Sequence, residues 1–194
     1  MAWNISIRPE HPDDFSTVER LVEEAFRPLA ISDHTEHLLV AALRRSESFI
    51  PALSLVAEIA PHRIVGQVLL TRIAVAGESG VFDTLGVAPL SVAPAFQRQG
   101  VGTALMHEAH RRARRLGFTS ALLVGHAAYY ARLGYPPGSR IGIRFPFGDP
   151  DACCLVVQLG PGGLEGVSGV VRQPAALGLR GCFRFLSCEI TGGG

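Results

Sequence analysis

The segment that decides the fold is Leu90-Ser-Val-Ala-Pro-Ala-Phe-Gln-Arg-Gln-Gly-Val-Gly-Thr-Ala-Leu-Met-His-Glu-Ala-His-Arg-Arg-Ala-Arg-Arg-Leu-Gly117. Its apolar start reads as the end of a strand that leads into Pro94. A turn with glycines at positions 100 and 102 follows, and an amphipathic helix then continues to Gly117. A glycine turn at a helix start presents several backbone N–H groups to one point, where they can bind an anion. The segment therefore predicts an anion-binding loop.

Composition narrows the classes of protein that can carry this loop. The chain has 194 residues, of which 47% are apolar and 18% charged, and this excludes a disordered chain. The formal net charge is +1, so we expect no nucleic-acid partner and no attraction to an anionic membrane. No apolar run approaches the roughly 18–20 residues of a membrane span, and the N-terminus does not resemble a signal peptide. We expect a cytoplasmic protein.

The cysteines do not form a recognisable metal site. Cys153 and Cys154 are adjacent, so on a strand they would point to opposite faces. Neither they nor Cys182 and Cys188 form a C-x-x-C pair. We expect reduced thiols and no bound metal.

Upstream of the loop, apolar spacing predicts two helices between strands. Ile5 to Arg8 alternates as a strand does, and a helix capped by Asp13 or Asp14 runs to Phe26. A second helix follows a possible capping box of Asp33 and Glu36 and ends near Arg45. Three strands come next, over residues 53–59, 64–75 and 85–92.

Downstream of the loop, Thr119 to Val124 is an almost entirely apolar strand. Strand, helix and strand in this order imply a parallel pair joined by a right-handed crossover. A short helix over 127–133 closes at Gly134, and residues 141–147 and 153–159 are predicted to form a final antiparallel pair. We expect residues 1–160 to be one domain and residues 161–194 to be a C-terminal extension that packs on it or trails from it.

Three kinds of glycine loop compete for residues 97–102. A phosphate-binding loop of the Walker type requires a lysine, which the segment lacks. A dinucleotide-binding loop requires a third glycine where Leu105 stands. The remaining pattern, Gln97-x-x-Gly100-x-Gly102, suits a pyrophosphate but also fits an ordinary strand-to-helix loop.

The sequence on both sides of this loop resembles that of a known protein family. The pattern Gln97-x-x-Gly100-x-Gly102, the later Tyr129-Tyr130-Ala-Arg-Leu-Gly134-Tyr135 and the order of elements resemble the GCN5-related N-acetyltransferase (GNAT) superfamily. That resemblance implies an α/β (α+β) GNAT fold. Its central sheet is mixed and mostly antiparallel, with a splayed parallel strand pair and flanking helices.

A narrower resemblance rests on Leu85-Gly86, Pro89-Leu-Ser-Val92 and Gly125-His-Ala-Ala-Tyr-Tyr130. These stretches are similar to the subgroup of predicted acetyltransferases named for the bacterial protein YhbS. The chain departs from that subgroup at His126, where aspartate is usual, and at Tyr135, where phenylalanine is usual. The resemblance covers about residues 4–160.

The resemblance implies a site for acetyl-CoA (CoA) as co-substrate, with no metal. Tyr130 would face the thioester sulfur and act as general acid, and Tyr129 would pack beside it. The general base is open, with His126 as first candidate and Glu36, Glu58 and Asp83 as alternatives. The residues implied to bind the cofactor are Leu90, Ser91, Val92, Gln97, Arg98, Gln99, Gly100, Val101, Gly102, Thr103 and Tyr130.

The implied activity is an acetyl-CoA-dependent N-acetyltransferase, in which an amine attacks the thioester directly within a ternary complex. The amine would belong to a small molecule or a peptide that the sequence does not identify. Two alternatives stay open: a catalytically degenerate CoA-binding sensor or structural protein of the same fold, and an enzyme that uses longer acyl-CoA donors. The protein would be a monomer or a homodimer.

The basic cluster near the end of the central helix has a structural explanation. Its arginines lie in the last turns, where cations suit the helix dipole and the solvated face. Glu108 is expected to pair with Arg112 at i, i+4.

Overall fold

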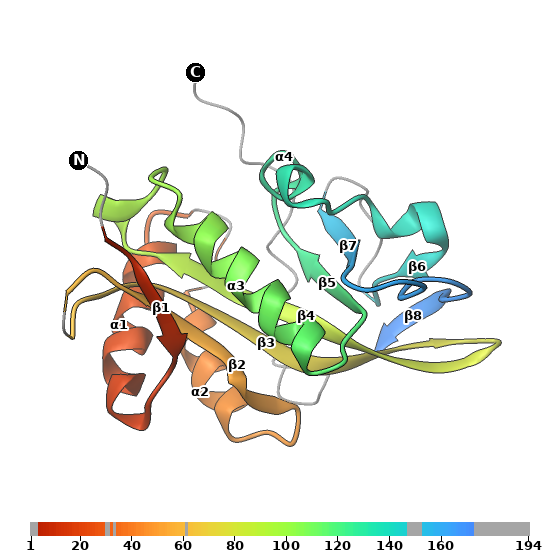
Figure 1. Cartoon of the computed structure of the whole chain (residues 1–194), viewed down its shortest axis with the longest axis horizontal. Coiled ribbons are helices and arrows are strands. Elements are labelled where there is room, and N and C mark those ends of the chain that lie inside the picture. The colour runs from red at the N-terminus through yellow and green to blue at the C-terminus, as the bar shows by residue number, and fades with distance from the viewer. Residues whose placement is uncertain (1–3, 30–31, 33, 61, 147–152, 173–194) are drawn as a thin grey trace.

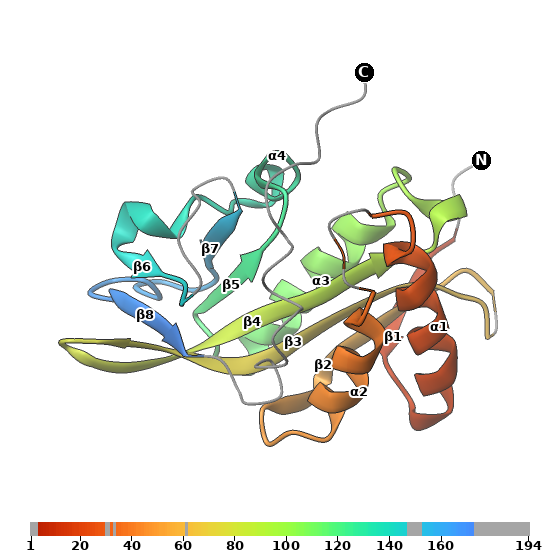
Figure 2. The same cartoon turned by 180° about the vertical axis from the view of Figure 1, so that it is seen from behind.

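The computed structural model describes residues 4–29, 32, 34–60, 62–146 and 153–172. One twisted sheet runs through the molecule and carries helices on both faces (Figure 1). Helices α1 (Phe15–Phe26) and α2 (Glu36–Arg44) cover one face, as Figure 2 shows, and α3 (Val101–Arg115) crosses the other. The short helix α4 (Ala127–Tyr130) follows the end of β5.

The strands pair in the order β1-β2-β3-β4-β5-β7, and β8 pairs with both β3 and β6. Every pair is antiparallel except β4–β5 and β6–β8. The parallel pair predicted on either side of α3 is therefore confirmed. The strands are β1 (Ser6–Pro9), β2 (Phe49–Glu58), β3 (Ile64–Gly77), β4 (Gly80–Val92), β5 (Ser120–Val124), β6 (Ile143–Arg144), β7 (Cys154–Gln158) and β8 (Gly169–Arg172). Short 3-10 turns are η1 (Pro12–Asp14), η2 (Pro94–Phe96), η3 (Ala131–Leu133) and η4 (Gly138–Ile141).

The predicted antiparallel pair of residues 141–147 and 153–159 is wrong. In the described part of the chain, β7 pairs with β5 on one side, and β6 pairs with β8 instead. The other side of β7 is used by the segment just before η4: the Val156 N–H donates to the carbonyl of Pro136, and Pro137 bridges Leu155. This segment takes the edge that β6 would need.

Residues beyond Gly160 contribute to the same sheet as far as they are described. Strand β8 pairs with the far end of β3, where Val75 lies opposite Val171. The close approach of the chains there requires glycine, because a Cβ on Gly169 would lie 2.1 Å from the carbonyl oxygen of Ala76. The sequence alone showed no periodic signal in this region.

Helix α3 forms where the apolar spacing predicts it. Leu105, Ala109 and Ala113 are all fully buried on one face. The expected Glu108–Arg112 pair is confirmed at 2.7 Å, and Gly117 follows the helix in a left-handed conformation. Asp14 stands at the N-cap position of α1 but makes no side-chain cap there, and the predicted cap residue Asp33 lies outside the described residues.

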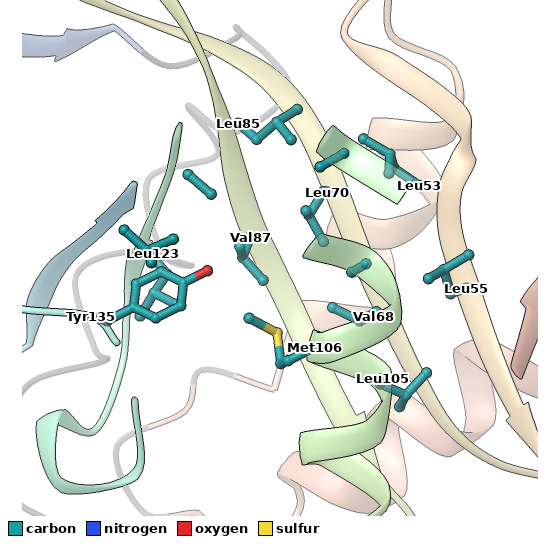
Figure 3. Packing of buried hydrophobic residues seen from close by; sticks show 14 of the residues in the cluster. Leu53, Leu55, Val68, Leu70, Leu85, Val87, Leu105, Met106, Leu123 and Tyr135 are labelled. Carbon is teal, nitrogen blue, oxygen red and sulfur yellow. The ribbon is translucent and has the colours of Figure 1, made fainter. Parts of the chain in front are cut away.

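Two apolar clusters lie on the two faces of the sheet, one under α1 and α2 and the other under α3. Figure 3 shows the second cluster, in which Leu105 and Met106 of α3 lie near Val68 of β3, with Leu70 further along that strand. Tyr135 belongs to this cluster and lies beside Leu123 of β5. None of the helices in the described ranges has the length and apolarity to cross a bilayer.

Candidate functional site

Strands β4 and β5 pair over a short distance only. Leu85 pairs with Ala121 and Gly86 with Leu122, and no further β4–β5 pair is formed in the described chain. A register shift between β3 and β4 occurs before Leu90, and such an irregularity bends a strand. The end of β4, Leu90 to Val92, therefore keeps its pairing with β3 while the edge toward β5 is left open.

At this open end, the loop from Gln97 to Gly100 leads into α3. Gly100 is the N-cap residue, with φ 85°, and no side chain caps the helix. The first N–H groups of a helix lack intrahelical partners and carry the positive end of its dipole. The Gln97 side-chain amide donates to the Val92 carbonyl at 3.1 Å, which ties the loop to the strand. The loop thus presents uncapped backbone donors beside the open strand edge.

A cavity of about 930 Å³ joins these features. Its size falls within the range of small-molecule sites, which is roughly 300–1,000 Å³. The described residues that line it include Arg98, His107 and Arg132 but no aspartate or glutamate, so its charge suits an anionic ligand. The lining residues are Leu90, Val92, Phe96, Gln97, Arg98, Gly100, Gly102, Thr103, His107, Tyr129, Tyr130, Arg132 and Leu133.

Tyr130 is the last residue of α4 and lines the cavity. Its ring rests against Gly125, where a Cβ would lie 2.4 Å from Tyr130 Cε2. The rings of Tyr129 and Tyr135 meet it edge-on, with centroids 4.9 Å and 5.7 Å away. Burial, and to a lesser extent the neighbouring Tyr129, raises the pKa of the Tyr130 hydroxyl well above its ordinary value. The hydroxyl is therefore protonated throughout the neutral range.

Most of the residues predicted to bind the cofactor line this cavity, but three do not. Ser91 points to the opposite face of the sheet, is 2% exposed and has no hydrogen-bond partner for its Oγ among the described residues. Val101 packs into the apolar cluster under α3, and the Gln99 side chain bonds to the Ala95 carbonyl. Backbone atoms of these residues can still face a ligand.

The candidate base His126 is the exposed N-cap residue of α4, and its side chain is outside the set that lines the cavity. The alternatives are engaged elsewhere. Glu58 binds Arg8 at 3.1 Å, Asp83 lies 3.8 Å from Arg72, and Glu36 accepts a hydrogen bond from Ser32. The structure does not bring any of these carboxylates to the cavity.

Sequence reasoning missed several side chains of the cavity. Tyr129 was expected only to pack, yet it lines the cavity and its hydroxyl lies over the first turn of α3. His107 follows Thr103 by one helical turn, so a plot of the α3 faces could have found it. The Arg132 guanidinium lies 5.9 Å from the centroid of the Tyr129 ring, and the 3-10 turn η3, which continues directly from α4, brings it there.

A second cavity, of about 660 Å³, lies beside β1. Asp13, Asp14 and Glu58 line it, together with Arg8. The Arg8 guanidinium lowers the pKa of both Asp14 and Glu58 below their usual values, so these groups are ionised at neutral pH. Its acidic lining makes this cavity a poor site for a phosphate.

Comparison with known proteins gives one consistent result. The family profile described as "Acetyltransferase (GNAT) domain" matches residues 51–137. The uncharacterized N-acetyltransferase YjhQ of Escherichia coli K12 is 35% identical over 154 residues, which are 77% of this chain and 83% of YjhQ. The uncharacterized N-acetyltransferase YhbS of the same strain is 28% identical over 165 residues, covering 85% of this chain and 93% of YhbS.

Two solved structures have the same architecture. The crystal structure of E. coli YhbS in complex with CoA superimposes with a TM-score of 0.83 at 24% identity, over 94% of this chain and 96% of that one. A GNAT family acetyltransferase from Brucella melitensis, solved with acetyl-CoA, gives a TM-score of 0.73 at 28% identity, over 90% of this chain and 98% of that one.

Proposed function

Because this chain belongs to the GNAT acetyltransferase family, we propose that it transfers the acetyl group of acetyl-CoA to an amine by direct attack within a ternary complex. The observation that carries the proposal is the continuous cavity from the uncapped N-terminus of α3 to the hydroxyl-bearing ring of Tyr130. One end of this cavity suits a diphosphate, and the other holds a proton donor.

The residues present fit the donor. Gly100 and Gly102 let the backbone approach a diphosphate, whose charge suits the helix N-terminus and Arg98. The open edge of Leu90 to Val92 can pair with the amide-bearing arm of CoA as an added strand would. This arrangement directs the thioester along β4 toward Tyr130.

Tyr130 has the role of general acid in this proposal. When the amine nitrogen bonds to the acetyl carbon and the carbon–sulfur bond breaks, the sulfur leaves as a thiolate that needs a proton. The Tyr130 hydroxyl is protonated at neutral pH and lines the cavity, so it can donate that proton or a hydrogen bond.

The amine must lose a proton in the same reaction. His126 remains our candidate base, because it directly precedes α4, the helix that carries Tyr130, and its side chain is exposed. Replacing His126 by Gln tests this role, since a lower turnover number with unchanged acetyl-CoA affinity is expected of a base.

The test combines binding and turnover. Calorimetry with CoA and acetyl-CoA is expected to show one site per chain, and a thiol-release assay over a panel of small amines and peptides is expected to show at least one acceptor. Tight binding with no thiol release from any acceptor would favour a CoA-binding sensor or structural protein. Comparing acetyl-CoA with longer acyl-CoA donors in the same assay identifies the preferred acyl chain.

A further inference from the structure

A buried histidine on α3 is hydrogen-bonded to a tyrosine that follows α4. His110 Nε2 lies 2.8 Å from the hydroxyl oxygen of Tyr135, and their rings are 5.6 Å apart. His110 is 6% exposed and Tyr135 is 2% exposed, so water does not compete for this bond. Neither residue lines the cavity.

Tyr135 in turn contacts Tyr130 in two ways. Its ring meets the Tyr130 ring at 66°, with centroids 5.7 Å apart, and its N–H donates to the Tyr130 carbonyl at 3.2 Å. Figure 3 shows Tyr135 beside Leu123, with its hydroxyl oxygen on the side of Val87 and α3. The side chain therefore connects α3 with the ring that lines the cavity.

Tyr130 depends on such packing for its position. Its hydroxyl makes no hydrogen bond to a side chain or backbone group in the described part of the chain. What holds the ring is Gly125 beneath it and the edges of Tyr129 and Tyr135. A shift of Tyr135 would leave that side of Tyr130 without a contact.

We propose that Tyr135, held by its hydrogen bond to His110, is a positioning residue that sets the orientation of the Tyr130 hydroxyl in the cavity. The inference rests on the proposed function, because it assumes that Tyr130 acts on the leaving thiolate. It concerns a group outside the cavity.

The charges around the pair support a fixed geometry at neutral pH. Burial, together with Arg114 and His107, lowers the pKa of His110 to about 4. Burial, with a smaller effect of Tyr130, raises the pKa of Tyr135 well above its ordinary value. Both groups are therefore neutral across the physiological range, and the bond between them does not change as pH varies there.

Three variants test the proposal in steady-state assays with acetyl-CoA and the acceptor found by thiol release. Tyr135→Phe removes one oxygen atom and keeps the ring. Because a misplacement of about 1 Å at a catalytic group can cost roughly 100-fold, we expect a loss of about 10-fold in kcat with unchanged KM for acetyl-CoA. His110→Leu should lower kcat by the same factor as Tyr135→Phe. His110→Gln keeps a hydrogen-bonding group and should therefore have a kcat close to that of the unaltered protein.

Ser120→Ala is the matched control, because it removes another buried hydrogen bond, between the hydroxyl groups of Ser120 and Thr84 at 2.7 Å, away from the cavity. It should lower the melting temperature and leave kcat unchanged. In a Tyr130→Phe background, Tyr135→Phe should have no further effect on kcat. The proposal would be overturned if Tyr135→Phe lowered kcat as much in the Tyr130→Phe background as in the unaltered protein. It would also be overturned if Tyr135→Phe alone left kcat unchanged.

A readout without turnover separates this inference from the proposed function. The chain contains 3 tyrosines, so ring signals of ¹³C-labelled tyrosine can be assigned by substitution. Tyr135→Phe and His110→Leu should shift or broaden the Tyr130 signals, whereas Ser120→Ala should not. Unchanged Tyr130 signals would refute positioning, and absence of thiol release by the unaltered protein would refute the function alone.

Discussion

The hydroxyl oxygen of Tyr129 lies 2.8 Å from the point that a Cβ atom on Gly102 would occupy. The tyrosine from α4 therefore reaches across the cavity to the first turn of α3. This contact is possible because position 102 has no side chain. In the proposed function, the absence of a side chain there also keeps the backbone donors of the first turn of α3 accessible to a diphosphate. The proposed donor site and α4 therefore come into contact at Gly102.

Gly102→Ala is expected to weaken acetyl-CoA binding by about 10-fold, equivalent to about 1.4 kcal/mol, because the methyl group fills the approach to the backbone donors. Calorimetric titration measures the change. The double variant Gly102→Ala/Tyr129→Phe removes the hydroxyl that the methyl would meet. It should bind as weakly as the single variant, and restored affinity would show that displacement of Tyr129, not a blocked anion site, caused the loss.

Tyr130→Phe is expected to lower kcat by about 100-fold, the lower part of the range for general acid catalysis, while the Kd for acetyl-CoA stays unchanged. The ring and its contacts remain, so the melting temperature should not fall. The raised pKa of Tyr130 keeps it protonated, so kcat of the unaltered enzyme should show no alkaline decline from this group below about pH 10. Equal kcat in enzyme and variant would remove the proton-donor role.

His110 should make stability depend on pH. Its pKa in the folded protein is lowered from 6.5 to about 4, so the unfolded chain binds a proton first as pH falls. The contribution of neutral His110 to the free energy of unfolding is fully present above about pH 6.5. It is lost as the pH falls from 6.5 toward 4, and it does not change further below pH 4. Between pH 7 and pH 5 we expect the free energy of unfolding to fall by about 2 kcal/mol because of this group.

Urea unfolding at the two pH values measures this loss, and His110→Gln is the control because it lacks the titrating group but shares all carboxylates. The difference between protein and variant isolates His110. Identical pH dependence of the two would mean that His110 is not kept neutral by folding.

A buried ion network joins α2 to α1 and to Glu10, the residue that follows β1. The Arg44 side chain is 4% exposed, binds Glu19 at 2.7 Å and also binds Glu10, whose side chain is 1% exposed. Arg44→Met should lower the free energy of unfolding by about 3–5 kcal/mol, because it leaves the Glu10 carboxylate buried without a cation. Adding Glu10→Gln should restore much of the loss in urea unfolding. If the double variant were as unstable as Arg44→Met, the loss of stability would come from lost packing against Phe15 instead. The centroid of the Phe15 ring lies 4.1 Å from the Arg44 guanidinium.

Local sequence predicted the central part of the fold because its signals are local. The apolar spacing of Leu105, Ala109 and Ala113 predicts a buried helical face, and the apolar run from Thr119 to Val124 predicts a strand covered on both sides. The order strand, helix, strand then leaves a parallel crossover as the expected connection, and β4–β5 has it.

The partners of the last strands were not predictable in the same way. Apolar content marks Ile143 and Leu155 as buried but does not say which edge each strand joins. The Pro136–Pro137 segment occupies the edge of β7, and β8 comes from a glycine-rich stretch without period. Which strands pair depends on which segments, far apart in the sequence, reach a free sheet edge, and a local sequence pattern does not contain this information.

Local sequence was enough to predict the glycine loop at residues 97–102, the helix that follows it and the tyrosine pair, because backbone conformation and helical spacing are set within a few residues. Two contacts of the site could not be read from local sequence: Tyr129 reaches Gly102, and His110 is hydrogen-bonded to Tyr135. Both contacts join α3 to the segment that follows β5, and these two parts of the chain meet only because β4 and β5 lie side by side in the packed sheet.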